Sequence, residues 1–291
     1  MNEAFPERLS LVERAARRLE AEQEAEAAEA SQVLRPPFQA PGSPPPGGSD
    51  SVSRQVVIDL DVLASQGYLT PNRMQVRLAQ EIRVIKRSLV NNFQSREVPR
   101  PNLIMVTSSN PREGKSFMAM NLAISLACEV DYHVLLVDSD FMRPVVFQRL
   151  NLTPAAGLMD WLRDPDLDVA DIMMRTNIGR LSLIGPGKKH DLSTELLASQ
   201  RMAQLSDELA ERYPDRLIIF DAPPMLACTE PSVLAEHMGQ VVFVVEADKT
   251  PKVSVRKALS MLPRTCWTGL VLNKGRARGV TDYYDDYGYR Y

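Results

Sequence analysis

The chain has 291 residues, of which 44% are hydrophobic, and a formal net charge of -3 at pH 7. This apolar content suffices for a sizeable core, and the weakly acidic balance excludes a nucleic-acid-binding protein that works through a global basic field. The cysteines Cys128, Cys228 and Cys266 lie far apart without a CxxC or Cys/His cluster, which excludes a disulfide framework and a zinc site and fits a reducing compartment. The first residues lack the apolar core of a signal peptide, and no run approaches the roughly 18–20 apolar residues of a membrane span. We therefore expect a soluble, cytoplasmic protein without a transmembrane segment of its own.

The first part of the chain differs in composition from the rest. Residues 1–34 predict a disordered or helical segment with a narrow apolar stripe at helical spacing, formed by Leu9, Leu11, Val12, Ala15, Ala16 and Leu19. Such a helix is marginal alone, so we favour a solvated, partly formed helix over a docking helix for a partner. Residues 35–55 are rich in Pro, Gly and Ser and predict a linker. A folded domain over residues 56–280 and a tyrosine-rich tail over 281–291 complete the predicted layout.

The predicted domain begins with a strand or turn over residues 56–63, followed by a long helix over 72–91. Apolar residues occupy one face of that helix at positions 78, 82, 85 and 89. Basic residues occupy other positions, where we expect a solvated surface; they are Arg77, Arg83, Lys86 and Arg87.

From residue 103 onward, apolar runs and helical patterns alternate. Strands are predicted over residues 103–106, 134–138, 181–184, 217–221, 240–245 and 269–273. Helices are predicted over residues 117–127, 158–162, 169–174, 193–212 (with Ser193 as N-cap), 231–237 and 253–262. This alternation predicts an α/β fold in which a mostly parallel sheet is sandwiched by helices. In such sheets ligands bind at the carboxyl ends of the strands.

The loop after the strand at 103–106 carries the pattern of a phosphate-binding P-loop. Backbone N–H groups of such a loop and of the following helix form an anion site, Lys115 reaches the terminal phosphates and the Ser116 hydroxyl ligates Mg²⁺. The usual first glycine is Ser109, so the pattern is relaxed. The candidate nucleotide-binding residues are Ser109, Asn110, Pro111, Arg112, Glu113, Gly114, Lys115, Ser116 and Phe117.

Aspartates follow two further predicted strands. Asp138 and Asp140 end one, and Asp221 ends another after four apolar residues, as a Walker B aspartate does. One such aspartate alone is usually a cap or turn residue. The P-loop and the aspartates at two strand ends, together in one alternating fold, favour a metal site. Mg²⁺ takes few protein ligands, so Ser116 and one or two aspartates are the expected set. Arg143 either reaches a phosphate or a neighbouring chain, or forms a surface salt bridge.

The tail contains five of the eight tyrosines: Tyr283, Tyr284, Tyr287, Tyr289 and Tyr291. No apolar periodicity predicts a buried strand there. Either the tail is simply a disordered, adhesive end, or it is a phosphorylatable segment, and we favour the second. Each phosphate would add roughly -1.5 to -2 charges. The basic residues within 274–278 either hold a phosphate or an acidic tail, or are solvated.

These motifs together resemble the bacterial tyrosine kinase (BY-kinase) family, the P-loop kinases of exopolysaccharide and capsule synthesis. The relaxed Walker A motif at 109–116, a Walker A′ motif at 134–144, a Walker B motif at 217–224 and the tyrosine cluster carry the resemblance, which spans residues 75–291. It makes residues 56–280 a kinase domain. The segments at 9–19 and 58–63 are further similar to the tyrosine autokinase of exosortase (PEP-CTERM) polysaccharide loci.

The resemblance implies autophosphorylation of the tail tyrosines in trans, with ATP and Mg²⁺, in regulation of exopolysaccharide polymerisation and export. It implies a separate membrane chain-length-determinant (Wzz-type) activator, which recruits the chain to the inner face of the plasma membrane, and a tyrosine phosphatase. It assigns catalysis to Lys115, Asp138 (the base) and Asp140. It assigns Mg²⁺ binding to Ser116, Asp140 and Asp221, and contact with the adenine to Asn273.

Two departures from the family pattern are visible. The subunit-contact motif Glu-x-x-Arg-x-x-Arg corresponds here to Gln80, Arg83 and Lys86, which weakens the inference of a ring-shaped oligomer. Ala222 replaces a hydroxyl residue after Asp221 without removing a metal ligand. The alternatives are a ParA/MinD-like ATPase and a non-catalytic, nucleotide-dependent regulator of polysaccharide export. The first typically has an additional lysine early in the P-loop, where this chain has Asn110 and Pro111, and lacks a tyrosine tail.

Overall fold

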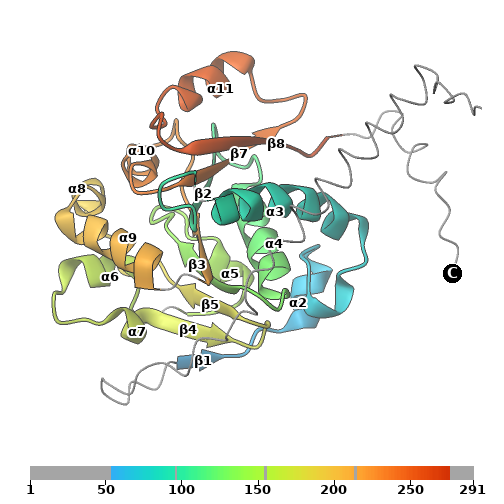
Figure 1. Ribbon diagram of the computed structural model, residues 1–291, viewed down its shortest axis with the longest axis horizontal. Helices are drawn as coiled ribbons and strands as arrows, with labels where there is room; N and C mark the ends of the chain where they lie inside the picture. The colour runs from blue at the N-terminus through green and yellow to red at the C-terminus, as the bar shows by residue number, and fades with distance from the viewer. Residues whose placement is uncertain (1–53, 96, 154–155, 213–214, 276–291) are drawn as a thin grey trace, which may run out of the picture. The chain divides into compact units, whose positions relative to one another are not determined.

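One twisted sheet lies at the centre of the computed structural model, which describes residues 54–95, 97–153, 156–212 and 215–275 (Figure 1). Within these residues the strand order is β1-β4-β5-β3-β6-β2-β7-β8. All neighbouring pairs are parallel except β4 and β5, so the expected mostly parallel sheet is confirmed. The strands are β1 (Arg54–Val56), β2 (Leu103–Ser108), β3 (His133–Asp138), β4 (Met173–Thr176), β5 (Leu181–Ile184), β6 (Arg216–Asp221), β7 (Gln240–Glu246) and β8 (Trp267–Asn273).

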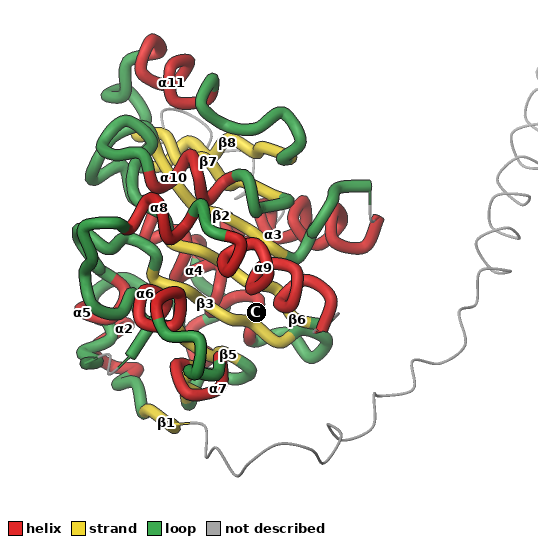
Figure 2. Tube along the Cα trace, turned by 90° about the vertical axis from the view of Figure 1, so that its left-hand side faces the viewer, coloured by secondary structure: helices red, strands yellow, loops and turns green. Residues whose placement is uncertain are grey.

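Helices cover both faces of this sheet. Figure 1 shows α3 and α4 on one side of the strands and α6, α8 and α9 on the other, and in Figure 2 the strands form a continuous layer from β8 to β1. The helices are α2 (Leu60–Ser65), α3 (Arg77–Ser95), α4 (Lys115–Ala127), α5 (Val146–Arg149), α6 (Leu158–Arg163), α7 (Val169–Ile172), α8 (Ser193–Leu197), α9 (Gln200–Arg212), α10 (Glu230–Ala235) and α11 (Lys252–Leu259), with a 3-10 turn at Pro71–Arg73.

Two apolar cores result from the alternation of side chains along the buried strands. In β2, Ile104 and Val106 contribute to the core beneath α3 and α4, whereas Leu103 and Met105 contribute to the core beneath α6, α9 and α10. A strand buried on both faces has to be apolar at nearly every position, which explains the continuous apolar runs of the central strands.

The strand register brings the carboxyl ends of the central strands together. Asp138 of β3 pairs with Asp221 of β6, and Asp221 pairs on its other side with Val106 of β2. The P-loop follows β2, which lies between β6 and β7 in the sheet. The aspartates and the P-loop, far apart in sequence, therefore lie at one edge of the sheet.

The segment predicted as a strand or turn at 56–63 divides into two elements. Strand β1 ends at Val56, and helix α2 begins at Leu60. Asp59 caps α2, because its side chain accepts hydrogen bonds from the backbone N–H groups of Asp61 and Val62.

Two predicted helices are wrong in part. The helix predicted at 169–174 ends at Ile172, and the chain continues as β4, which pairs antiparallel with β5. The helix predicted at 193–212 is broken between α8 and α9, where the Ser199 hydroxyl accepts from the Met202 N–H. The N-cap of α8 is Leu192 and not Ser193 as predicted. The Ser193 hydroxyl donates instead to Glu230 of α10.

The long helix α3 corrects the prediction for Lys86. The helix begins at Arg77 instead of residue 72, and Lys86 is only 7% exposed. Its ammonium donates to the carbonyl of Ser125 at 3.3 Å and pairs with Glu129 at 2.5 Å, at the end of α4. Lys86 therefore joins α3 to α4, whereas Arg83 is exposed as expected. The other predicted elements agree in type, with ends within three residues of those observed.

The predicted N-terminal helix, almost all of the linker and the five tail tyrosines lie outside the described residues. No helix within the described residues combines the length and the hydropathy required to cross a membrane.

Candidate active site

The P-loop turns sharply between β2 and α4. Gly114 precedes α4 with φ of 105°, and Arg112 also has a left-handed backbone, with φ of 70°. The left-handed backbone favours glycine at this position, and a Cβ on residue 114 would lie 2.0 Å from the Nδ2 atom of Asn273, so any other residue would also have to displace that side chain. The loop therefore leads into the first turn of α4, whose N–H groups suit an anion.

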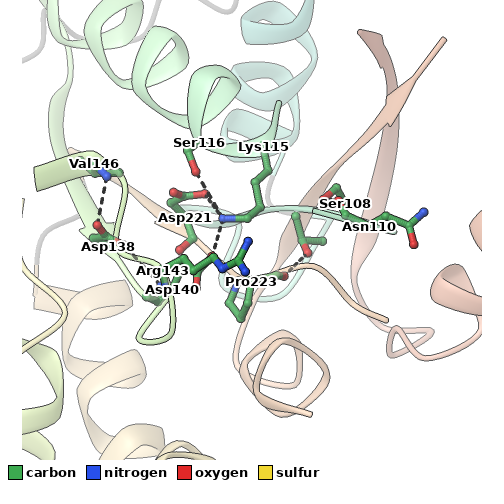
Figure 3. A network of polar contacts seen from close by, with 12 residues as sticks. Ser108, Asn110, Lys115, Ser116, Asp138, Asp140, Arg143, Val146, Asp221 and Pro223 are labelled. Carbon is green, nitrogen blue, oxygen red and sulfur yellow. Dashed lines mark hydrogen bonds and ion pairs between the residues drawn. The ribbon is translucent and has the colours of Figure 1, made fainter. Parts of the chain in front are cut away.

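Lys115 lies at the start of α4 and points toward the strand ends (Figure 3). Its Nζ atom is 2.8 Å from Asp140, 3.4 Å from Asp221 and 3.3 Å from the Ser116 hydroxyl. Lys115 is 8% exposed. The predicted phosphate and metal residues of three separate segments thus meet around one ammonium group.

Asp138 is fixed by backbone donors at the end of β3. One carboxylate oxygen accepts from the Asp140 N–H at 3.3 Å and the other from the Val146 N–H at 3.2 Å. Asp140 in turn accepts from the backbone N–H of Arg143 at 2.9 Å. The loop after β3 therefore holds both aspartates in defined positions.

The surroundings of these groups shift their protonation. Burial, together with the charge of Asp221, raises the pKa of Asp138 well above its usual range. Burial also raises the pKa of Asp221, although Lys115 acts in the opposite direction. Burial alone would lower the pKa of Lys115, but Asp221 and Asp140 outweigh that effect and raise it. Asp140 and Asp221 therefore share one ammonium, with Asp138 at the adjoining strand position, so the site contains more carboxyl groups than cations.

The donor set fits Mg²⁺. The Oδ2 atom of Asp221 is buried and has no hydrogen-bond partner among the described residues. Asp140 and the Ser116 hydroxyl both contact the Lys115 ammonium. Within the described residues, no group of three or more His, Cys, Asp or Glu side chains is arranged to hold a metal alone. This agrees with the habit of Mg²⁺ to take one or two carboxylates and complete its shell with water and phosphate oxygens.

The remaining predicted P-loop residues have different surroundings. Ser109 is buried, and its hydroxyl has no hydrogen-bond partner in the part of the chain that the structure describes, whereas Pro111 and Arg112 are exposed. Phe117 packs against Tyr68, with the ring centroids 5.2 Å apart. Asn110 and Glu113 bond to each other.

Asn273 and Arg143 also lie at this edge. The amide of Asn273 donates to the backbone carbonyl of Glu113 at 2.9 Å, so its observed contact is with the P-loop itself. Arg143 is exposed and, in the part of the chain that the structure describes, forms no ion pair. Figure 3 labels Arg143 among the residues of this network, and its backbone N–H donates to the Asp140 carboxylate.

Sequence reasoning missed the support that later segments give to the P-loop. The segment after β6 runs along it, since Met225 and Leu226 donate their N–H groups to the carbonyls of Ser108 and Ser109. Thr250 and the chain after β8 contact it as well. Sequence motifs carry no signal for these contacts, because they join residues more than a hundred positions apart.

No protein-family model matches the chain. Among curated proteins, the tyrosine-protein kinase YwqD of Bacillus subtilis is 30% identical over 201 residues, which cover 68% of this chain and 83% of that protein. The putative tyrosine-protein kinase CapB of Staphylococcus aureus is 26% identical over 72% of this chain and 90% of that protein. The tyrosine-protein kinase wzc of Salmonella typhimurium is 30% identical over 65% of this chain, but the match spans only 26% of that longer protein.

Solved structures give the same result. The kinase domain of the Escherichia coli tyrosine kinase ETK has a TM-score of 0.58 and 28% identity, over 71% of this chain and 80% of that one. The chimerical protein CapA2B2 has a TM-score of 0.61 and 26% identity, over 73% of this chain and 97% of that one. The matched fold includes the parallel sheet and the helices that position the candidate site.

Proposed function

The chain belongs to the family of bacterial protein-tyrosine kinases, ATP-dependent transferases, and on this premise we propose that it is an autokinase that phosphorylates its own tail tyrosines in trans. The acceptors are Tyr283, Tyr284, Tyr287, Tyr289 and Tyr291. The observation that carries the proposal is the meeting of Lys115, Ser116, Asp140 and Asp221, with Asp138 at the adjoining strand position. This set supplies what phosphoryl transfer needs, which is charge neutralisation and positioning.

In this proposal Lys115 neutralises negative charge on the phosphoryl group that leaves ATP. Its ammonium already lies between two carboxylates and keeps its proton, because its pKa is raised. The N–H groups of the P-loop and the first turn of α4 bind the phosphates. Ser116, Asp140 and Asp221 would hold Mg²⁺, which when bound shields the charge of the phosphate oxygens.

Asp138 takes the role of general base. As the tyrosine oxygen forms its bond to the γ-phosphorus, the bond from that phosphorus to the bridging oxygen of ADP breaks, and the phenolic proton passes to the Asp138 carboxylate. A raised pKa makes the ionised carboxylate a stronger base than an exposed aspartate. The N–H groups of Asp140 and Val146 fix its orientation.

The domain layout and the partner proteins in this proposal rest on the similarity to known tyrosine kinases. The matched region is about a quarter of the Salmonella protein, so a kinase domain of this kind also occurs within much longer chains. We assign to this chain a kinase domain at 56–280, flanked by the segments 1–34, 35–55 and 281–291. A membrane chain-length-determinant protein would activate it and bring it to the inner face of the plasma membrane, and a tyrosine phosphatase would reverse its reaction. The outcome is control of exopolysaccharide polymerisation and export.

Phosphotyrosine formation tests the activity directly. Purified full-length protein is incubated with ATP and Mg²⁺ and probed for phosphotyrosine, beside Lys115→Met and a truncation after Val280. We expect a signal in the wild type that both variants lose. Strong ATP hydrolysis without phosphotyrosine, even with the cytoplasmic segment of the activator present, would overturn the kinase and favour a ParA/MinD-like ATPase.

The direction of transfer needs a mixed reaction. A Lys115→Met chain with a tag that changes its length is mixed with untagged wild type. We expect phosphate on the tagged, inactive chain, because active molecules supply the site. Absence of phosphate there, with normal labelling of the wild type, would indicate transfer within one chain.

A further inference from the structure

Glu113 lies inside the P-loop, but its side chain serves the loop rather than its anion site. The residue is 3% exposed. One carboxylate oxygen accepts from the Asn110 N–H at 3.1 Å, and the other accepts from the Asn110 amide at 3.1 Å and from the Thr250 hydroxyl at 2.6 Å. The N–H group of Asn110 is thus turned toward Glu113. A buried carboxylate that is fully occupied in this way fixes the start of the loop relative to its middle.

Thr250 reaches this carboxylate from the segment that follows β7. Its hydroxyl accepts from the Glu246 N–H at 3.2 Å and donates to Glu113, so both functions of the hydroxyl are used. The Thr250 N–H in turn donates to the Glu246 carbonyl at 3.1 Å. Two bonds to the end of a core strand therefore orient the hydroxyl before it meets Glu113.

The end of β8 holds the same loop at two further points. The Asn273 amide donates to the carbonyl of Glu113 at 2.9 Å, and the Lys274 ammonium donates to the carbonyl of Arg112 at 2.6 Å. Lys274 is itself held by Glu246, at 3.2 Å. These bonds explain how Arg112 keeps a left-handed backbone, which a non-glycine residue adopts only when its surroundings impose it.

We propose that Thr250 and Glu113 are positioning residues for the nucleotide. Together with Asn273 and Lys274 they form the P-loop brace, which joins the ends of β7 and β8 to the loop and keeps it in its phosphate-binding shape before ATP arrives. The inference rests on the proposed role of the P-loop in binding nucleotide. Hydrogen bonds to a carboxylate are about twice as strong as neutral ones, and a preformed loop spares the ordering cost of binding.

The test is a conservative series at Thr250. Thr250→Val keeps the shape and removes the hydroxyl, Thr250→Ser restores it, and Thr268→Val on neighbouring β8 makes the same change outside the brace. Binding of a fluorescent ADP analogue and initial rates of phosphotyrosine formation at varied ATP are measured. We expect Thr250→Val to weaken nucleotide binding about 10-fold and raise KM equally, with kcat within about 2-fold, because Lys115 and the aspartates are untouched.

Rescue separates positioning from general damage. We expect Thr250→Ser to bind within about 2-fold of the wild type and Thr268→Val to be unchanged. Equal nucleotide affinity in Thr250→Val and the wild type would overturn the brace. If Thr250→Val does not fold, as judged by circular dichroism, Glu113→Gln decides in its place. Its single amide oxygen cannot replace both carboxylate oxygens, so either the Asn110 N–H or the Asn110 amide and the Thr250 hydroxyl lose their acceptor. Undiminished affinity would equally overturn the proposal.

The outcomes also separate this inference from the kinase itself. If the wild type binds the nucleotide but forms no phosphotyrosine, the proposed kinase activity is contradicted. The nucleotide affinities of Thr250→Val and the wild type then still decide on the P-loop brace. A wild type that binds no nucleotide overturns both.

Discussion

Single residues at this site bear charges that the fold itself does not neutralise. Asp138 and Asp221 end neighbouring strands at paired positions, and Asp221 has one oxygen without a partner. A bound Mg²⁺ would compensate for such a set, so the nucleotide-free fold gives up some stability for function.

Replacing one of these charges therefore changes stability and ligand response in opposite directions. We predict that Asp221→Asn stabilises the nucleotide-free protein, since burial raises the pKa of Asp221 and therefore disfavours its charge. Thermal denaturation in EDTA should then give a higher Tm, by roughly 2–4 °C per kcal/mol. The extra rise that Mg²⁺ and ATP produce in the wild type should vanish. A lower Tm without ligand would contradict this account.

The raised pKa of Asp138 makes the free energy of unfolding depend on pH. Its folded pKa lies above its unfolded value, so the folded state binds more protons between the two, and its contribution falls as pH rises from about 4 through the folded pKa. We predict that urea unfolding in Mg²⁺-free buffer gives a less negative slope of stability against pH for Asp138→Asn than for the wild type. Carboxyl groups distant from Asp138 are common to both proteins and cancel in the difference, whereas Asp221, whose charge acts on Asp138, belongs to the same effect. Identical slopes would show that Asp138 does not retain its proton.

Among the elements, α3 and α4 are joined by a charge that sequence patterns place on the surface. Lys86 is buried between them and donates to the last turn of α4. A cation there also complements the negative end of the helix dipole. The ammonium that the sequence resemblance places in a subunit-contact motif is thus occupied within the chain, by Ser125 and Glu129.

This contact has a matched control on its own helix. We predict that Lys86→Met lowers stability by roughly 1–3 kcal/mol, because it removes a charged donor from a buried carbonyl. Arg83→Met, at an exposed position of α3, should stay within about 0.5 kcal/mol of the wild type. Chemical denaturation measures both. Equal effects would place Lys86 in solvent, as the sequence alone suggests.

The elements also show what local patterns can predict. The central strands are buried on both faces, so their apolar runs identify them, and the Gly-Lys-Ser sequence identifies the P-loop. β4 was missed because Met173–Thr176 continues a helical pattern and becomes a strand only through its pairing with β5. The break before α9 depends on one serine hydroxyl, and the contact of Thr250 with Glu113 joins residues 137 positions apart. Such contacts follow from the assembled sheet and leave no local pattern.

On the scale of the whole molecule, β8 precedes the proposed acceptor tail and contacts the P-loop of the candidate active site. Asn273 contacts the P-loop, and Tyr283 follows ten residues later. Ten residues span at most about 33–36 Å, so the covalent distance alone leaves the chain's own site within reach of that tyrosine.

Dilution distinguishes the two routes. If transfer occurs in trans, the initial rate of phosphotyrosine formation per molecule should rise in proportion to protein concentration, because two chains must meet. A rate that stays constant over a hundredfold dilution, at saturating ATP, would establish transfer within one chain.

Because β8 is anchored against the P-loop, the tail of the same chain and the tail of a second copy compete for the candidate site, and no sequence motif shows this competition. A tethered segment is present at its own site at an effective concentration in the mM range for short linkers, whatever the bulk concentration. A second copy can prevail only where chains are crowded together or where the orientation of the tethered segment prevents its entry. Concentrating the kinase on a surface would therefore itself act as the signal that starts phosphorylation.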